Sequence, residues 1–147
     1  MRRRSRQILL LSASIIPSTN EFSLGDLTTT RDFTYVEDTC RGFLAIAEME
    51  GRSGEVFNIG SNHEISIADL VGLISDIMGT KFRVICDPQR IRPEKSEVLR
   101  LKCENSKLKT ACGLVPSLSM RQGLESTIRW FTEPANLRRC KGNLHNV

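Results

Sequence analysis

Residues 25–39 read GDLTTTRDFTYVEDT and contain, in order, a turn, an alternating segment and the start of a helix. The glycine-aspartate pair that opens them is typical of a turn. Residues 32–35 then alternate polar and apolar side chains in a stretch rich in β-favouring residues, as a half-buried strand does. We therefore expect a strand over 32–35, with Phe33 and Tyr35 on one face.

The residues from Glu37 onward predict an amphipathic helix. Apolar side chains recur there at the spacing of three and four that gathers them on one side of a helix. These side chains are Cys40, Phe43, Leu44 and Ala47. Glu37 and Asp38 lie in the first turn, where carboxylates interact favourably with the helix dipole. We expect Asp38 to satisfy backbone amides rather than to act as a base, and Gly51 and Gly54 to end the helix.

The other segments predict further strands and helices. Short strands are expected over 21–24, 56–59 and 82–86. Helices are expected from the capping box Ser66/Asp69 to about Met78 with Gly79 in a left-handed conformation, from Asn105 to Cys112 before Gly113, and from the box Ser119/Gln122 through Phe131. Alternating strand and helix segments place the chain in the α/β class.

Length and charge limit the classes of function. A chain of 147 residues is the size of one domain, since domains commonly hold roughly 100–200 residues. The net charge of +4 is local, because the first six residues supply four of the 21 basic side chains and the rest holds 17 basic and 17 acidic ones. One tyrosine, one tryptophan and six phenylalanines on a nearly neutral body give no aromatic-studded basic surface. Nucleic-acid binding is therefore not expected.

The cysteines and the N-terminal residues indicate the compartment. The five cysteines contain no C-x-x-C pair and form no recognisable zinc motif with the two histidines. Their odd number is typical of a reduced cytoplasmic chain. The arginine cluster and the apolar run at 8–11 imitate a secretory signal, but serines interrupt the apolar stretch before Pro17, and it is too short to cross a bilayer. We expect a cytoplasmic protein without a metal or a membrane segment.

Two segments carry a resemblance to a known family. Residues 25–39, followed later by Arg92-Pro93-Glu94-Lys95-Ser96-Glu97-Val98, resemble the C-terminal substrate-binding part of the extended short-chain dehydrogenase/reductase family, the NAD-dependent epimerase/dehydratase family. The resemblance covers roughly residues 24–131 and is closest to sugar-nucleotide 4,6-dehydratases such as UDP-N-acetylglucosamine 4,6-dehydratase. It implies an α/β fold that corresponds to the substrate-binding part and lacks the Rossmann dinucleotide-binding half.

The sequence of this chain lacks the motifs that such enzymes use to bind the dinucleotide and to transfer hydride. None of the ten glycines falls in a G-x-G-x-x-G arrangement. Tyr35, the only tyrosine, is followed four residues later by Thr39 instead of lysine. The resemblance implies NAD(P) for full-length members of the family. For this chain alone we expect no catalytic residue and no bound cofactor.

The resemblance places Arg31 and Arg92 near the diphosphate of a nucleoside-diphosphate sugar. A planar guanidinium can hold phosphate oxygens with two hydrogen bonds, and two such groups match the two negative charges. The alternative for Arg31 is a structural ion pair with Asp32, Glu37 or Asp38.

The polar segment after Arg92 is expected to reach the ribose hydroxyls. Lys95 and Glu97 are the residues that we expect there. The alternatives are a solvated surface charge for Lys95 and a helix or turn cap for Glu97. Asn58 is expected to hold a neighbouring loop in place.

We expect residues 1–20 to be an atypical basic and apolar tail outside the fold, and residues 21–147 to be a sugar-nucleotide-binding domain. The tail departs from the family pattern, which suggests a truncated or frame-disrupted reading frame. The expected function is that of a sugar-nucleotide-binding fragment of an NAD(P)-dependent nucleotide-sugar 4,6-dehydratase or epimerase, inactive alone. The alternatives are a non-catalytic UDP-sugar binding module and an interaction remnant that docks on a Rossmann-containing family member through residues 37–50.

Overall fold

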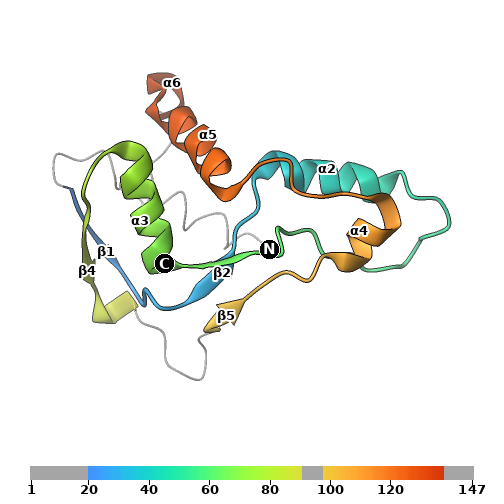
Figure 1. Cartoon of the computed structure of the whole chain (residues 1–147), viewed down its shortest axis with the longest axis horizontal. Coiled ribbons are helices and arrows are strands. Elements are labelled where there is room, and N and C mark those ends of the chain that lie inside the picture. Colours follow the sequence, from blue (N-terminus) through green and yellow to red (C-terminus); the bar gives the residue numbers. More distant parts are fainter. Residues whose placement is uncertain (1–19, 91–97, 138–147) are drawn as a thin grey trace.

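The computed structural model describes residues 20–90 and 98–137. In chain order the elements are β1 (Glu21–Leu24), β2 (Thr30–Asp32), α2 (Val36–Ala47), β3 (Glu64–Ser66), α3 (Ile67–Met78), β4 (Arg83–Cys86), the 3-10 helix η1 (Pro88–Arg90), β5 (Arg100–Leu101), α4 (Ser106–Cys112), α5 (Met120–Thr132) and α6 (Pro134–Leu137). Figure 1 shows an elongated molecule with β1, β4 and α3 toward one end and α2 and α4 toward the other. The α/β class is confirmed.

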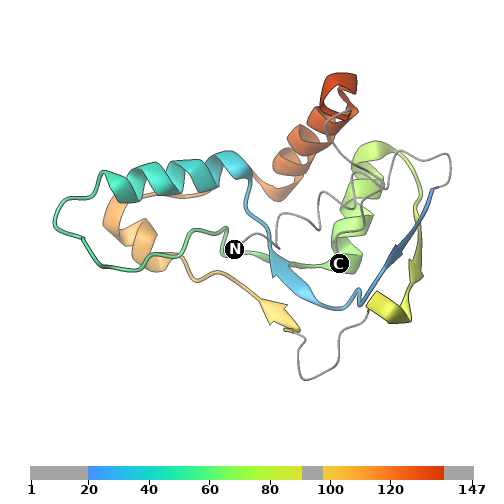
Figure 2. The same cartoon turned by 180° about the vertical axis from the view of Figure 1, so that it is seen from behind.

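The strands form two small sheets. In the first, β1 and β4 pair in parallel, with Phe22 opposite Val84. In the second, β2 lies between β3, to which it is antiparallel, and β5, to which it is parallel. Figure 2 shows from behind that β1 leads through a short connection into β2. The chain therefore passes directly from the first sheet to the central strand of the second, which carries Arg31 opposite Ile65 and Leu101.

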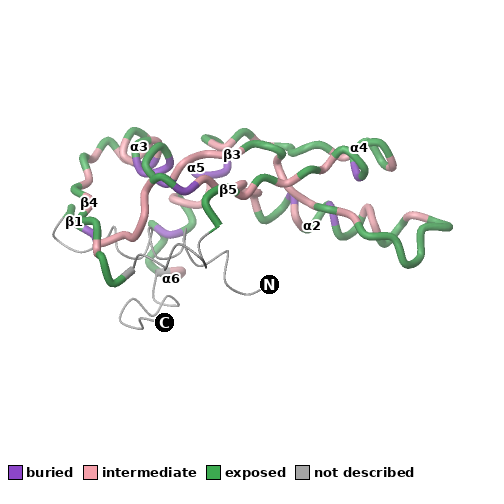
Figure 3. Tube along the Cα trace, turned by 90° about the horizontal axis from the view of Figure 1, so that it is seen from below, coloured by how far each residue is buried: buried purple, intermediate pink, exposed green. Residues whose placement is uncertain are grey.

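The core lies between α3, α5 and the first sheet. Its buried members are Phe22, Leu70, Val71, Ile74 and Leu124. The ring of Phe22 meets that of Phe82 edge-on, with 5.6 Å between the ring centroids. Because α3 is apolar along one side, it can pack onto the sheet while its other side stays in solvent. Figure 3 shows this buried region around α3 and α5.

The helix boundaries follow the predicted capping signals. Ser66 accepts a hydrogen bond from the Asp69 amide at 3.0 Å, and Gly79 ends α3 in the left-handed region at φ 61°. Ser119 and Gln122 form the complete capping box at the start of α5. Gly113 ends α4 at φ 69°, as expected for a residue without a Cβ. These terminal predictions are confirmed.

Two strand predictions are wrong. The strand expected over 32–35 lies at 30–32, because only those residues have partners on β3 and β5, and α2 begins at Val36. The strand expected over 56–59 is not formed, since those residues have no ladder partner among the described residues. The prediction at 82–86 is confirmed as β4, whereas β3 was not predicted.

Helix α2 packs against the rest of the molecule with the side that carries Asp38 and Gly42, and its apolar side lies opposite. Asp38 and Gly42 are buried, and the side chain of Ile59 lies directly against Gly42. Phe43 and Leu44 are 55% and 64% exposed. The predicted helix is confirmed, but it ends at Ala47, before Gly51 and Gly54. Its apolar side faces outward.

Candidate functional site

Arg31, the first expected diphosphate contact, lies on the central strand of the second sheet. Its Nη1 donates hydrogen bonds to the carbonyl oxygens of Thr30 at 2.7 Å and Val98 at 2.8 Å. Val98 is the last residue of the other segment that carries the family resemblance. The fold therefore brings Arg31 to the C-terminal end of that segment, although 67 positions separate the two residues.

The other expected substrate contacts, Arg92, Lys95 and Glu97, lie outside the described residues. Their roles at the diphosphate and ribose stay predictions. The residues after them are fixed to β2, because the Thr30 amide donates to the Leu99 carbonyl at 2.8 Å.

Both oxygens of the Asp32 carboxylate accept hydrogen bonds from neighbouring loops. One carboxylate oxygen accepts from the Ser61 amide at 2.9 Å and hydroxyl at 2.7 Å, and the other accepts from the Cys103 amide at 3.0 Å. Asp32 thus ties β2 to two loops. This bonding gives Asp32 a structural role other than the ion pair with Arg31 that we considered.

A polar cluster crosses the second sheet beside Arg31. Glu64 on β3 accepts from the Thr30 hydroxyl at 2.6 Å and pairs with the guanidinium of Arg100 on β5. These hydrogen bonds, chiefly that from Arg100, lower the pKa of Glu64 to about 2. The carboxylate is therefore ionised at neutral pH and fixes the three strands relative to one another. Sequence reasoning missed this cluster, because Glu64 and Arg100 lie 36 positions apart and neither belongs to a local motif.

Asp38 joins the start of α2 to the segment before α5. It accepts from the Ser117 hydroxyl at 2.6 Å and amide at 2.9 Å, and from Arg41 at 2.8 Å. Burial opposes ionisation, but these hydrogen bonds outweigh it and lower the pKa of Asp38. The prediction that Asp38 satisfies backbone amides is confirmed, although the amide belongs to a distant segment.

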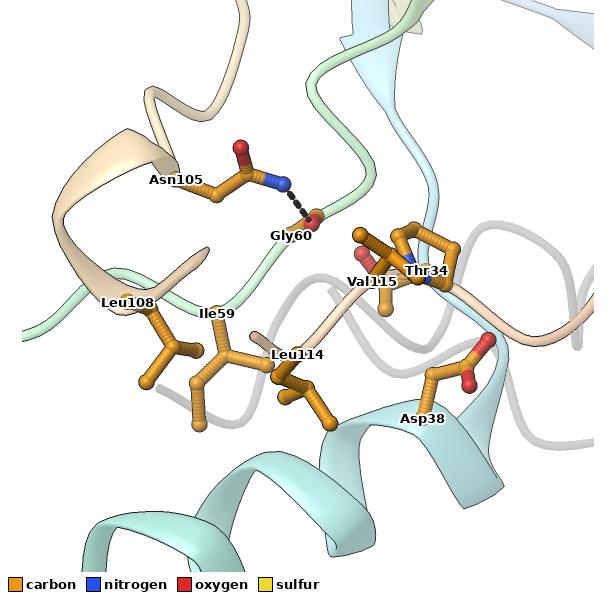
Figure 4. A pocket seen from close by; sticks show the side chains of 9 residues that line it. Thr34, Asp38, Ile59, Gly60, Asn105, Leu108, Leu114 and Val115 are labelled. Carbon is orange, nitrogen blue, oxygen red and sulfur yellow. Dashed lines mark hydrogen bonds between the residues drawn. The ribbon is translucent and has the colours of Figure 1, made fainter. Parts of the chain in front are cut away.

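A small pocket lies between α2, α4 and the segments at 59–60 and 114–116 (Figure 4). Its lining consists of Thr34, Asp38, Ile59, Gly60, Asn105, Leu108, Leu114, Val115 and Pro116. Asn105 donates from Nδ2 to the Gly60 carbonyl at 2.8 Å across one rim. Among the described residues that line this pocket none is basic, so these residues do not offer the charge complement that a diphosphate needs.

Asn58 and Asn105 hold loops rather than ligands. Asn58 donates from Nδ2 to the Glu104 carbonyl at 3.1 Å, which confirms the expected structural role. Asn105 precedes α4 as predicted, but its side chain bonds Gly60 and does not cap the helix. Glu104 instead accepts from the Ser106 amide at 2.8 Å.

The cysteines of the described part are free thiols, namely Cys40, Cys86, Cys103 and Cys112. Burial, assisted by the nearby carboxylates of Asp32 and Glu104, raises the pKa of Cys103. A raised pKa reduces the thiolate fraction and with it the reactivity. Within residues 20–90 and 98–137, no group of histidines, cysteines and carboxylates is placed to hold a metal ion.

The described residues do not fit a nicotinamide dinucleotide. A dinucleotide loop places glycines between a strand and the N-terminus of a helix, where backbone amides face the pyrophosphate. The glycines with positive φ instead lie after helices, at Gly51, Gly54, Gly79 and Gly113. In the same described ranges, no helix is long and apolar enough to span a bilayer.

Comparison with known proteins identifies the fold. The model of the family described as GDP-mannose 4,6 dehydratase matches residues 2–127, so the match includes the N-terminal segment set apart above. A UDP-N-acetyl-alpha-D-glucosaminuronate decarboxylase from Bacillus cytotoxicus is 35% identical over 114 residues, which are 76% of this chain and 35% of the relative.

Two solved structures show the same arrangement of elements. The epimerase Mth375 from Methanothermobacter thermautotrophicus matches with a TM-score of 0.73 and 30% identity, over 90% of this chain and 38% of that one. The UDP-glucuronic acid 4-epimerase from Bacillus cereus, solved with UDP-glucuronic acid and NAD, matches with a TM-score of 0.69 and 30% identity, over 82% and 37%. This chain thus spans about a third of the length of its relatives and corresponds to their C-terminal part.

Proposed function

This chain belongs to the GDP-mannose 4,6 dehydratase family of extended short-chain dehydrogenases/reductases, and we propose that residues 21–147 are a sugar-nucleotide-binding domain that is inactive alone. The observation that carries the proposal is the restriction of the match to the C-terminal part of enzymes that act on nucleotide sugars. The enzyme type that we propose for the whole is an NAD(P)-dependent 4,6-dehydratase or epimerase.

The position of Arg31 supports a diphosphate site at the second sheet. Its hydrogen bond to Val98 brings a guanidinium next to the segment that carries Arg92. In our proposal Arg31 and Arg92 bind the diphosphate, and Lys95 and Glu97 bind the ribose. Two fixed guanidinium groups would match the two charges of the diphosphate.

The chemistry of the whole enzyme requires groups that this chain does not offer. A bound nicotinamide would supply hydride transfer, but neither the glycines nor Tyr35 fit that cofactor or its catalytic pair. We propose that this chain orients the sugar nucleotide and that another part of the enzyme holds NAD(P). As part of the same proposal we place the protein in the cytoplasm, since the four described cysteines are free thiols.

Titration calorimetry with UDP-N-acetylglucosamine tests the substrate site. We expect saturable binding to the wild-type chain and a loss of about 1.5–3 kcal/mol of binding free energy in Arg92→Ala, the value of a hydrogen bond to a charged group. The loss corresponds to roughly a 10- to 150-fold higher Kd. Arg129→Ala, which removes an exposed arginine on α5, is the matched control and should bind like the wild type. An unchanged Kd in Arg92→Ala would reject the diphosphate role.

A second candidate function, docking on a family member, is favoured by one observation. The apolar side of α2 is exposed, with Val36 and Leu44 each 64% accessible. A chain that docks through this helix would not need to bind a nucleotide sugar by itself.

A further inference from the structure

Two backbone carbonyls fix the direction of the Arg31 guanidinium. Its Nη1 donates to the oxygens of Thr30 and Val98, at 2.7 Å and 2.8 Å. One nitrogen that serves two acceptors holds this planar group in one orientation. The orientation therefore depends on how firmly the carbonyls of Thr30 and Val98 are held. Val98 lies outside the strand ladders of the described residues, so it needs support from other contacts.

Glu64 on β3 is linked to the residues that carry both of these carbonyls. One of its oxygens accepts from the Thr30 hydroxyl at 2.6 Å. Arg100 on β5 donates to both carboxylate oxygens, from Nε at 3.2 Å and from Nη2. Arg100 follows Val98 by two residues, and between them the Leu99 carbonyl accepts from the Thr30 amide at 2.8 Å. Glu64 is thus linked to Thr30 directly and to Val98 through Arg100.

The ion pair of Glu64 and Arg100 reinforces a short strand. Strand β5 has two residues, paired with Thr30 and Arg31 of β2, whereas strands commonly have about five or six. A guanidinium that binds both oxygens of a carboxylate is among the stronger polar contacts in proteins. The pair spans β2 and ties β5 to β3. We expect it to supply the rigidity that a ladder of two residues lacks.

This ion pair lies on the face of the second sheet opposite Arg31. Side chains alternate between the two faces of a strand, and the register places Arg100 beside Thr30, and Ile65 beside Arg31. Glu64 and Arg100 therefore act on Arg31 through the backbone of β2 and the residues just before β5. On a ligand held by Arg31, they can act only by positioning that side chain or by long-range charge.

We propose that Glu64 and Arg100 are positioning residues for Arg31, through which they set the affinity of the site for the diphosphate of a nucleotide sugar. Thr30 belongs to the same arrangement, since its hydroxyl binds Glu64 and its carbonyl binds Arg31. This inference deepens the proposed function and rests on the diphosphate role of Arg31.

Glu64→Gln separates positioning from simple attraction, because the two predict opposite results. The substitution removes a negative charge near an anion site, so attraction alone would tighten binding. Positioning predicts weaker binding, since a glutamine amide offers one acceptor oxygen in place of two. We expect the Kd for UDP-N-acetylglucosamine, measured by calorimetry on the full chain, to rise about three- to tenfold.

Arg100→Gln tests the other half of the ion pair at a side chain that is 76% exposed, so the variant should fold. Its Kd should rise by a similar factor. Arg83→Gln is the matched control, because Arg83 is also 76% exposed and pairs with Glu21 at 2.8 Å across the first sheet. This control should bind like the wild type. Circular dichroism checks that all variants are folded.

A double-mutant cycle shows whether Arg100 acts through Arg31. In the Arg31→Ala background, where NMR titration can follow the weaker binding, adding Arg100→Gln should change the Kd by less than about twofold. A residue that supports only the general stability of the domain would weaken binding by the same factor in both backgrounds.

Two results would overturn the inference. In the first, Arg31→Ala weakens binding, whereas Glu64→Gln binds as tightly as the wild type or more tightly. In the second, Arg100→Gln weakens binding equally with and without the Arg31 side chain. A wild-type chain that binds no nucleotide sugar would reject the proposed function itself, and this inference with it.

Discussion

Asp38 shows how one buried carboxylate fixes the geometry around the pocket. It joins α2 to Ser117, 79 positions along the chain, through the serine hydroxyl and amide. Asp38→Ala should lower the free energy of unfolding by about 1–3 kcal/mol, because the donors of Ser117 and Arg41 lose their acceptor. Urea denaturation measures this change. Asp76→Ala, whose side chain is 74% exposed, is the control and should change stability by less than about 0.5 kcal/mol.

Ser117→Ala completes a double-mutant cycle with Asp38→Ala. The variant removes the hydroxyl and keeps the amide bond. A coupling free energy of about 0.5–1.5 kcal/mol is expected for two directly bonded groups. Strictly additive effects would show that the two residues stabilise the fold independently.

Glu64 makes the stability of the second sheet depend on pH. Its pKa of about 2 in the folded chain lies below the ordinary value of 4.5, so its contribution to stability is complete above about pH 4.5 and is lost as the pH falls toward 2. Urea midpoints between pH 2 and 6 should therefore fall less steeply with acid in Glu64→Gln than in the wild type. Equal slopes for both proteins would contradict the assigned role of Glu64.

At the scale of elements, two helices carry a glycine in opposite environments. A Cβ at Gly42 of α2 would lie 2.7 Å from the Cγ2 atom of Ile59, whereas one at Gly72 of α3 would meet no atom within 4 Å. Gly42→Ala should destabilise the chain by about 1–3 kcal/mol through overpacking. Gly72→Ala should stabilise it by about 0.5–1 kcal/mol, because alanine loses less backbone entropy in a helix. Thermal unfolding monitored by circular dichroism shows whether each substitution raises or lowers the stability. A stabilising Gly42→Ala would show that α2 does not pack on Ile59 as described.

Helices could be predicted from the sequence more fully than strands could. Both limits of α3 follow from Ser66 and Gly79, and the start of α5 follows from the Ser119/Gln122 box, because capping groups act on backbone within a few residues. A strand depends instead on a partner elsewhere in the chain. Residues 56–59 have the alternating pattern but lack a partner among the described residues, and β2 is displaced to 30–32 by the positions of β3 and β5.

The candidate site could be predicted only in part for the same reason. Arg31 was recognised from a local motif, and the structure places it against Val98 at the end of the second motif. The Glu64 cluster and the Ser117 contact with Asp38 join residues far apart in sequence, so no local pattern announces them.

At the scale of the whole molecule, the proposed function predicts binding of the sugar nucleotide without turnover. The chain spans about a third of its relatives, carries the segments that resemble a sugar-nucleotide site and does not fit the dinucleotide. A domain of this kind should hold its ligand but leave it chemically unchanged, since binding alone does not lower the barrier to reaction.

The most direct test is proton NMR of the purified chain mixed with UDP-N-acetylglucosamine and NAD. We predict saturation transfer from the protein to the uridine and sugar protons, with no new sugar resonances after prolonged incubation. Conversion of the sugar by the chain alone would contradict the assignment of an inactive domain, and the absence of any saturation transfer would contradict the substrate site.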